Sequence, residues 1–201
     1  MALTNAALKA LPLAFENAEA FDLNPSHSLH IAELSLVIFD GLAAVHGYGP
    51  NERRLLEIAA RLHDIGWSIG LGAGHHKQSA RIIRKYGIPG LDEKEREVCA
   101  LTARFHTKSI PDEKKHRRFA EIDDESKDLV EWLAGILRVA DGLDSSHKKA
   151  VRSISCEVTE KTVRLRLDSP RNDCRKEIER AMKKHALLVK KTNRDIEYLC
   201  L

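Results

Sequence analysis

Apolar residues recur at steps of three and four along most of the first 150 residues of the chain. That spacing places them on one face of an α-helix, so it predicts a series of amphipathic helices. The clearest predicted helices cover residues 5–21, 27–46, 51–62, 75–86, 93–106 and 126–143. Turn-forming residues separate them, among them Asn24-Pro25-Ser26 and the glycines between 66 and 74, and we expect Ser26 to cap the second helix.

A second pattern begins after about residue 150, where apolar and polar residues alternate. Residues 153–158 and 163–167 both show this period of two, with Glu160-Lys161 between them at a tight turn, which predicts a β-hairpin. Residues 172–189 return to helical spacing, and residues 196–201 are predicted to form a closing strand. The predicted fold class is mainly α: a helical bundle over residues 1–150 with a small β-β-α-β appendage over residues 151–201.

Composition and charge exclude several classes of protein. The formal net charge is +3, which is too weak to indicate a nucleic-acid-binding surface. The longest apolar stretch, residues 34–45, is interrupted by Asp40 and Gly41 and is too short to cross a membrane. No secretory signal pattern opens the chain, and the four cysteines are widely spaced without a Cys-x-x-Cys pair. We therefore expect reduced cysteines and a cytoplasmic protein.

The dipeptide His63-Asp64 is the most informative chemical feature, because it ends an apolar helix and is followed at once by Ile65-Gly66. Neighbouring side chains on a regular helix diverge by roughly 100°. Both can approach one metal site only near a helix end, where the backbone is about to leave the helix. Gly66 and the glycines after it provide that exit.

Further imidazoles and a carboxylate lie near the ends of other predicted helices. These candidate ligands are His27, His75, His76, His106 and Asp141. Such groups are costly to bury unless they are paired or bind a metal, and imidazole with carboxylate suits Mn, Fe, Co, Ni or Zn. The chain has ten histidines, so chance proximity of unrelated polar residues is the alternative.

Basic residues lie beside these candidate ligands. Lys77, Arg104 and Lys108 would suit the oxygens of a phosphate group, although an ordinary charged helix face would give the same pattern. The basic residues at 148, 149 and 152 leave the same choice between a phosphate-facing rim and solvated surface. The lysines at 183 and 184 have no interleaved aromatic residues, so they do not favour nucleic-acid binding.

Leu62-His63-Asp64-Ile65-Gly66, with His27 before it and Asp141 after it, resembles the HD-domain metal-dependent phosphohydrolases. This resemblance can be narrowed to one family, and it then extends over residues 10–168. The stretches that carry it lie at 32–34, 39–42, 75–79, 103–108 and 137–144. They are similar to the C-terminal HD-like half of the exopolyphosphatase and guanosine pentaphosphate phosphohydrolase (Ppx/GppA) family. Gln78 departs from the pattern, because members often have a histidine there. The actin-like ATPase-fold module that carries the polyphosphate chemistry of full-length members also has no counterpart here. The resemblance thus implies a fold and an HD-type metal site rather than exopolyphosphatase catalysis.

The resemblance also implies roles for individual residues. His27, His63, Asp64 and Asp141 would form the basic one-metal set, and His106 with either His75 or His76 would complete a second metal site. The pattern from Gly74 to Ala80 favours His75 as the ligand, which leaves His76 to meet substrate. The expected catalytic residues are Asp64, His76, Lys77, Arg104 and Lys108.

We therefore expect a metal-dependent phosphohydrolase that acts on a small phosphorylated metabolite: a nucleotide, a guanosine polyphosphate or polyphosphate. Its cofactor would be one or two divalent ions per chain, of Mn, Fe, Ni, Co, Zn or Mg. The alternative is a non-catalytic or regulatory module. It would bind polyphosphate or a nucleotide, or it would dock onto a separate catalytic subunit as the detached C-terminal half of an exopolyphosphatase-like system. The predicted terminal strand would leave a sheet edge through which two copies could pair as a homodimer. Nucleic-acid and membrane partners are not expected.

Overall fold

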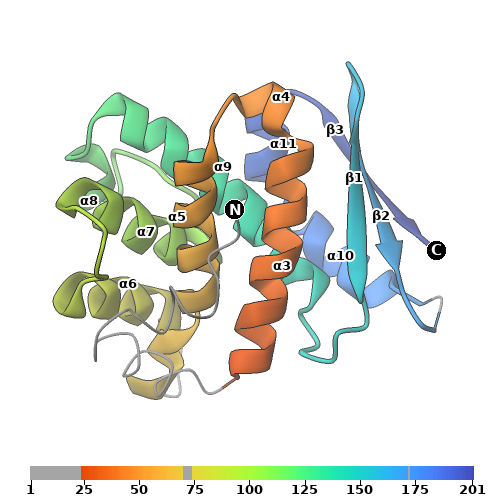
Figure 1. Cartoon of the computed structure of the whole chain (residues 1–201), viewed down its shortest axis with the longest axis horizontal. Helices are drawn as coiled ribbons and strands as arrows, with labels where there is room; N and C mark the ends of the chain where they lie inside the picture. Colours follow the sequence, from red (N-terminus) through yellow and green to blue (C-terminus); the bar gives the residue numbers. More distant parts are fainter. Residues whose placement is uncertain (1–23, 70–73, 172) are drawn as a thin grey trace.

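The computed structural model describes residues 24–69, 74–171 and 173–201, and it is mainly helical with a small C-terminal sheet (Figure 1). The helical part comprises α3 (Pro25–Gly41), α4 (Ala43–His46), α5 (Pro50–Leu62), the 3-10 helix η1 (Ile65–Ile69), α6 (His75–Tyr86), α7 (Glu93–Phe105), α8 (Arg117–Ala120) and α9 (Asp124–Leu143). The C-terminal part comprises β1 (Ser153–Val158), β2 (Thr162–Asp168), α10 (Arg175–Met182), α11 (Ala186–Thr192) and β3 (Asp195–Cys200). The predicted fold class is confirmed.

Helix α9 is the central element, and it packs against α3, α7, α10 and α11. Its residues are buried almost continuously from Leu129 to Leu143, as expected of a helix that is covered on all sides. Two glycines permit the closest approaches: a Cβ atom at Gly142 would lie 2.5 Å from the Cα atom of Ala181, and one at Gly135 would lie 3.3 Å from the Cα atom of Leu188. The C-terminal helices therefore pack directly on the backbone of α9.

The sheet has the order β1-β2-β3, with β1 and β2 antiparallel and β2 and β3 parallel. Val163, Leu165 and Leu167 of β2 are fully buried, and the residues between them are only partly buried, which is the alternation that the sequence predicts. Strand β1 packs against α3, where a Cβ atom at Gly41 would lie 2.5 Å from that of Cys156. One hydrophobic core thus runs from the helices into the sheet.

Several local predictions were wrong. Asn24, and not Ser26, caps α3, since its side chain accepts a hydrogen bond from the His27 amide. The predicted helix over 172–189 is divided into α10 and α11. The segment between the predicted helices over 93–106 and 126–143, for which no helix was predicted, contains the one-turn helix α8, because Phe119 is buried against Phe105.

The cysteine prediction was half wrong. Cys174 and Cys200 form a disulfide, whereas Cys99 and Cys156 are free. The two bonded residues are 26 positions apart, and they meet because β3 returns parallel to β2 beside the start of α10.

Two other predictions concern the N-terminal helix and membrane-spanning segments. The predicted helix over 5–21 lies outside the described residues. Within the described part of the chain, no helix is long and apolar enough to cross a bilayer.

Candidate metal centre

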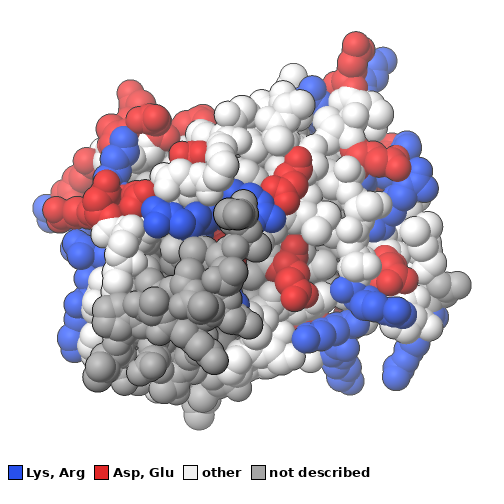
Figure 2. All heavy atoms as spheres, in the orientation of Figure 1, with Lys and Arg blue, Asp and Glu red and all other residues white. Residues whose placement is uncertain are grey.

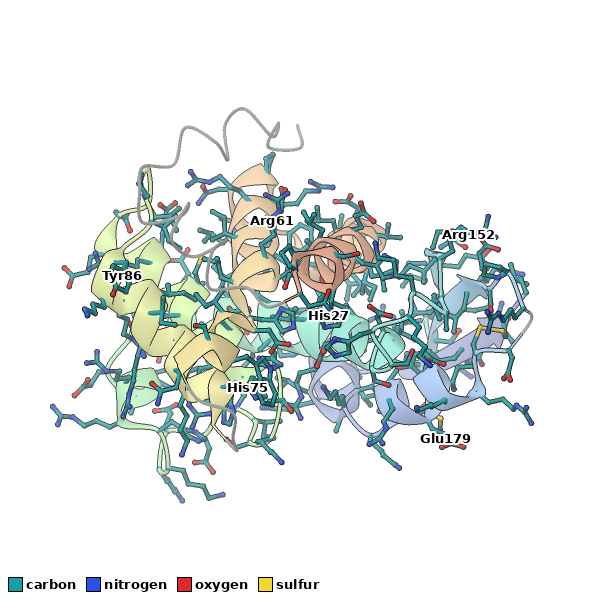
Figure 3. The ribbon with its side chains drawn as sticks, turned by 90° about the horizontal axis from the view of Figure 1, so that it is seen from below. His27, Arg61, His75, Tyr86, Arg152 and Glu179 are labelled. Carbon is teal, nitrogen blue, oxygen red and sulfur yellow. A yellow bond between two sulfur atoms is a disulfide. The ribbon has the colours of Figure 1, made fainter. Side chains whose placement is uncertain are left out.

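Several helix ends converge below the bundle, where Figure 3 shows His27 of α3 and His75 of α6 in neighbouring positions. Gly66 determines how closely two of these ends approach. A Cβ atom at Gly66 would lie 2.1 Å from the His75 carbonyl oxygen and 2.6 Å from the Ser79 amide nitrogen. The Gly66 amide also donates a hydrogen bond to Ser79 Oγ, over 3.0 Å. The turn after His63-Asp64 is therefore packed directly on the first turn of α6.

Three histidines of this region are held in one tautomer. The Nδ1 atoms of His63 and His106 lie 2.6 and 2.7 Å from the carbonyl oxygens of Ala60 and Ala103, each three residues earlier. His63 and His106 are the C-caps of α5 and α7, where helical carbonyls have no partner within the helix. Because a carbonyl oxygen can only accept, Nδ1 carries the proton and the lone pair of the neutral ring lies on Nε2.

His27 is held in a similar way by a carboxylate. Its Nδ1 atom lies 2.8 Å from Asp144 Oδ2, and both side chains are almost fully buried. A carboxylate that accepts a hydrogen bond from one imidazole nitrogen fixes the ring and raises the basicity of the other, as in the outer shell of metal-bound histidines. Asp144 was not among the predicted site residues, although it follows Asp141 by one helical turn.

The free nitrogens and Asp64 form two overlapping groups. Ligand atoms of His27, His63 and Asp64 lie within 4.8 Å of one another, and so do those of Asp64, His75 and His106. Asp64 Oδ2 is 3.6 Å from His63 Nε2, while Asp64 Oδ1 is 3.4 Å from His75 Nε2 and 3.5 Å from His106 Nε2. Asp64 is thus shared between the two groups.

These groups suit a divalent cation. His27 Nε2, His63 Nε2 and Asp64 Oδ1 are buried and have no hydrogen-bond partner among the described residues. Buried polar atoms without partners are costly, and a cation bound between them would remove that cost. Several imidazoles with carboxylate and no thiolate form a donor set typical of first-row transition metals. The residues present therefore fit the ion that this ligand pattern implies.

Burial and charge set the protonation of the shared groups. Burial raises the pKa of Asp64, but the imidazoles of His63 and His106 outweigh it and hold this pKa below its ordinary value. Burial and, to a lesser extent, the neighbouring His63 lower the pKa of His106 to about 3. An ionised carboxylate beside a neutral imidazole is the state in which both groups can bind a metal.

Asp141 enters the centre from the last turn of α9. Its Oδ1 atom is 3.6 Å from His27 Nε2 and 3.9 Å from His63 Nε2, while Oδ2 forms an ion pair with Lys184 Nζ. Burial raises the pKa of Asp141, but Lys184 and His27 outweigh it and hold it well below the ordinary value. Burial lowers the pKa of His27, but Asp141 and Asp144 outweigh burial and raise it to about 9.

Two positioning residues, Lys184 and Arg138, were not predicted from the sequence. Lys184 lies between α10 and α11, so the break in the predicted helix brings its ammonium group to Asp141. The buried Arg138 donates hydrogen bonds to the carbonyl oxygens of Phe105, Lys108 and Lys184, at 2.8, 3.2 and 3.2 Å. Arg138 thereby holds the end of α7 and the Lys184 backbone together. An arginine within an apolar helical run was the one signal available in the sequence.

The structure separates His75 from His76. Trp67 stacks on His75 at a centroid distance of 4.2 Å, and His75 faces Asp64 and His106. His76 belongs to neither ligand group. Burial and, to a lesser extent, the nearby cation of Arg104 lower the pKa of His76 to about 4.

The predicted phosphate-binding cations lie on the His76 side. Lys77 and Arg104 line a hollow of about 580 Å³ between α6, α7 and α8, and its other lining residues are Arg81, Arg84, Lys85 and Arg118. Arg104 Nη1 is buried without a partner among the described residues. Lys108 lies nearby with a positive φ of 59°, and its carbonyl oxygen is held by Arg138. This all-basic hollow suits an anion.

Most of the chain matches a model of a known protein family. Residues 14–190 match the family model described as Ppx/GppA phosphatase, domain III. The match takes in all the candidate ligands and the basic hollow, and it extends over β1, β2 and α10 into α11, so that β3 lies beyond it.

Proposed function

The chain belongs to the Ppx/GppA phosphatase domain III family, and from this premise we propose that it is a metal-dependent phosphohydrolase with an HD-type centre. The observation that carries the proposal is the set of buried, unpartnered atoms on His27, His63 and Asp64. Together with His75, His106 and Asp141, which complete the proposed ligand set, they surround space that a cation would fill. The substrate would be a small phosphorylated metabolite: a nucleotide, a guanosine polyphosphate or polyphosphate.

Divalent ions bound here would lower the pKa of water into the neutral range and neutralise phosphate oxygens. The chain's own residues would do the rest. Asp64, which belongs to both ligand groups, would help to hold the ions, and Asp144 would hold His27 in the binding tautomer. Imidazole-rich ligands favour Mn, Fe, Co, Ni or Zn over Mg.

Cations would hold the phosphate groups of the substrate. Lys184 already lies at Asp141, so its ammonium group could turn to a phosphate oxygen at the centre. Lys77, Arg104 and Lys108 would hold the more distant phosphates or the leaving group, and the neutral His76 beside them would accept or donate a hydrogen bond. Stabilisation of developing negative charge by preorganised donors is the largest catalytic contribution that such residues can make.

The test is phosphate release by Mn-loaded protein from GTP, guanosine tetraphosphate and tripolyphosphate. We expect release from at least one of them that stops with EDTA and is lost in Asp64→Asn. Lys161→Met is the matched control, because Lys161 lies exposed in the hairpin turn, away from the centre. Absence of release from all three by the metal-loaded wild type would contradict catalysis.

One observation favours a second candidate, a non-catalytic binding module. The ammonium group of Lys184 already supplies positive charge to Asp141, so part of the centre is compensated without a metal. In this case the chain would bind polyphosphate or a nucleotide, or dock onto a separate catalytic subunit. Tight tripolyphosphate binding in EDTA without hydrolysis in Mn would support this candidate.

A homodimer through the sheet edge and a cytoplasmic location also remain proposals. Sedimentation equilibrium tests the first. Counting the free thiols of freshly purified protein tests the second, because the Cys174–Cys200 disulfide would persist in an oxidising compartment and is rare in a reducing one.

A further inference from the structure

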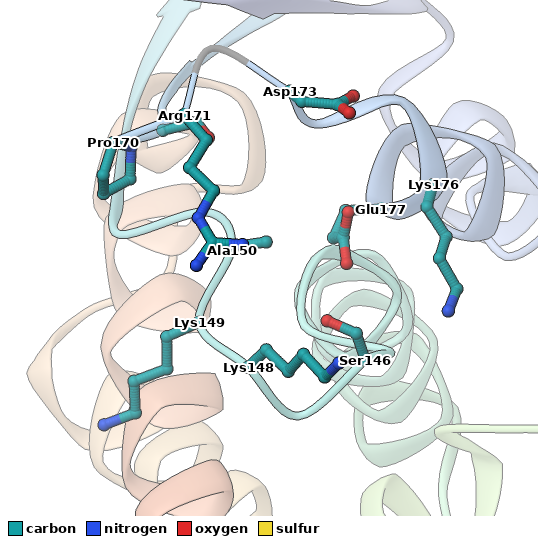
Figure 4. Close-up of a pocket in the computed structure, with 10 residues that line it drawn as sticks. Ser146, Lys148, Lys149, Ala150, Pro170, Arg171, Asp173, Lys176 and Glu177 are labelled. Carbon is teal, nitrogen blue, oxygen red and sulfur yellow. The ribbon is translucent and has the colours of Figure 1, made fainter.

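A second pocket, of about 490 Å³, lies between the segment that joins α9 to β1 and the segment that joins β2 to α10 (Figure 4). In Figure 2, lysine and arginine side chains gather on this lower side of the molecule, beneath the sheet. The pocket contains none of the ligand candidates of the metal centre. Its volume is in the range of small-molecule binding sites.

Four cations line this pocket, and none of them is paired with a carboxylate. Within the described part of the chain, the side chains of Lys148, Lys149, Arg171 and Lys176 form no ion pair and no hydrogen bond, and the lining carboxylate of Asp173 is paired with Arg175. Figure 4 shows Arg171 extending from the segment after β2 towards Ala150 on the opposite wall. Cations from separate segments that converge without partners create a positive potential, which suits an anionic group.

The pocket also contains buried polar groups that are left without partners. Glu177, on the first turn of α10, is only 4% exposed, and its carboxylate, which opens to the pocket, forms no ion pair or hydrogen bond among the described residues. Ser169, also 4% exposed, has a buried hydroxyl without a partner. Figure 4 shows the carboxylate of Glu177 directed into the space between Arg171 and Ser146. Buried polar groups are normally satisfied, so an occupant with hydrogen-bond donors would fit them.

These two features together restrict the chemistry of the occupant. Lys148, Arg171 and Lys176 favour phosphate, whereas the carboxylate of Glu177 would repel it. A ligand that is phosphate along its whole length would therefore leave Glu177 opposed to like charge. A ligand with phosphate at one end and N–H or O–H donors at the other would satisfy both parts.

One wall of the pocket is tied to the metal centre. Lys149 has a positive φ of 50°, and its amide donates a hydrogen bond to Asp144 Oδ1 over 2.8 Å, while Asp144 Oδ2 holds His27. His147, in the same segment, stacks on His27 at 3.9 Å between ring centroids. The pocket is thus separate from the centre but shares one supporting segment with it.

We propose that this pocket binds a nucleotide, with its phosphates at Lys148, Arg171 and Lys176 and a hydrogen-bond donor of its base at Glu177. This site is additional to the proposed phosphohydrolase centre and does not depend on a metal. It can therefore be tested whether or not the chain hydrolyses phosphate esters.

The test is isothermal titration calorimetry in EDTA with ADP, GDP, ribose 5-phosphate and tripolyphosphate as probes. We expect ADP or GDP to bind the wild type, and to bind Arg171→Met/Lys176→Met at least about 10-fold more weakly, because each charge-assisted contact contributes strongly to affinity. Both residues are exposed, so this variant should fold, and the exposed Lys161→Met is the matched control.

Glu177→Gln gives the sharpest result, because its effect should differ in sign between probes. Loss of the carboxylate charge should weaken nucleotide binding and strengthen tripolyphosphate binding. The inference would be overturned if neither nucleotide bound, or if Lys161→Met weakened binding as much as the double variant. A Glu177→Gln effect of the same sign on both probes, or ribose 5-phosphate binding as tightly as the nucleotides, would also overturn it.

Discussion

Replacing Gly66 by alanine should disrupt one of the two ligand groups selectively. The new Cβ atom would lie 2.1 Å from the His75 carbonyl oxygen and 2.6 Å from the Ser79 amide nitrogen, whereas ordinary contacts begin at 3.4 Å. Both neighbours are backbone atoms in the first turn of α6 and cannot rotate away. The turn after Asp64 and the start of α6 must therefore separate by more than about 1 Å.

Two quantities should change by predictable amounts. Overpacking of this kind costs about 1–3 kcal/mol in the free energy of unfolding. Metal–ligand distances tolerate only about 0.2 Å, so the displaced His75 should no longer bind with Asp64 and His106. The group formed by His27, His63 and Asp64 does not include α6, and it should keep its ion.

The assays are urea unfolding in EDTA and Mn titration by calorimetry, on Gly66→Ala beside Gly49→Ala. Gly49 is the matched control, because a Cβ atom there would lie 3.6 Å from Glu52 Oε2 and its φ is −112°. We expect Gly66→Ala to lose stability and one of two ions, and Gly49→Ala to stay within about 0.5 kcal/mol of the wild type. A Gly66→Ala protein with unchanged stability and unchanged Mn stoichiometry would refute the reasoning.

Three further predictions follow from single contacts. Asp144→Asn removes the charge that holds His27, and Mn affinity measured by calorimetry should fall about 10- to 100-fold, whereas an unchanged affinity would exclude this supporting role. Arg138→Met leaves three carbonyl oxygens without their donor and should destabilise the metal-free protein by roughly 3 kcal/mol in urea; a loss below about 1 kcal/mol would contradict the account. Burial lowers the pKa of His46 below 6.5, so the unfolded chain takes up this proton first as the pH falls. The stability that neutral His46 contributes is therefore present above pH 6.5 and declines below it. His46→Gln should reduce the fall in the free energy of unfolding between pH 7 and pH 5, and an unchanged fall would show that this histidine has no part in the acid sensitivity.

The sequence predicted the fold class well, because periodicity is a local property. Helical spacing over 126–143 and alternation over 153–167 both correspond to observed elements. Failures occurred where distant contacts decide the outcome. The break between α10 and α11 accompanies the pairing of Lys184 with Asp141, and the Cys174–Cys200 disulfide depends on the parallel return of β3. Neither contact leaves a periodic signal in the sequence.

The candidate site was predictable as a set of residue types near helix ends, but not as a geometry. His63 and His106 are placed by hydrogen bonds to carbonyls three residues earlier, which the position of a histidine at a helix end can suggest. The pattern from Gly74 to Ala80 favoured His75 over His76, but only the structure gives the distances of His75 to Asp64 and His106. Arg138 acts through three carbonyl oxygens that are 30 to 46 positions away, so its role could not be inferred from neighbouring residues.

The metal content of the protein tests the central claim most directly. The measurement is elemental mass spectrometry on protein purified without chelator or histidine tag, beside Asp64→Ala, with both proteins soaked in Mn and desalted. Because Asp64 is shared by both ligand groups, we predict one or two transition-metal ions per wild-type chain and their loss from the variant. Wild-type protein that holds no metal after soaking, or a variant that holds as much as the wild type, would contradict the account.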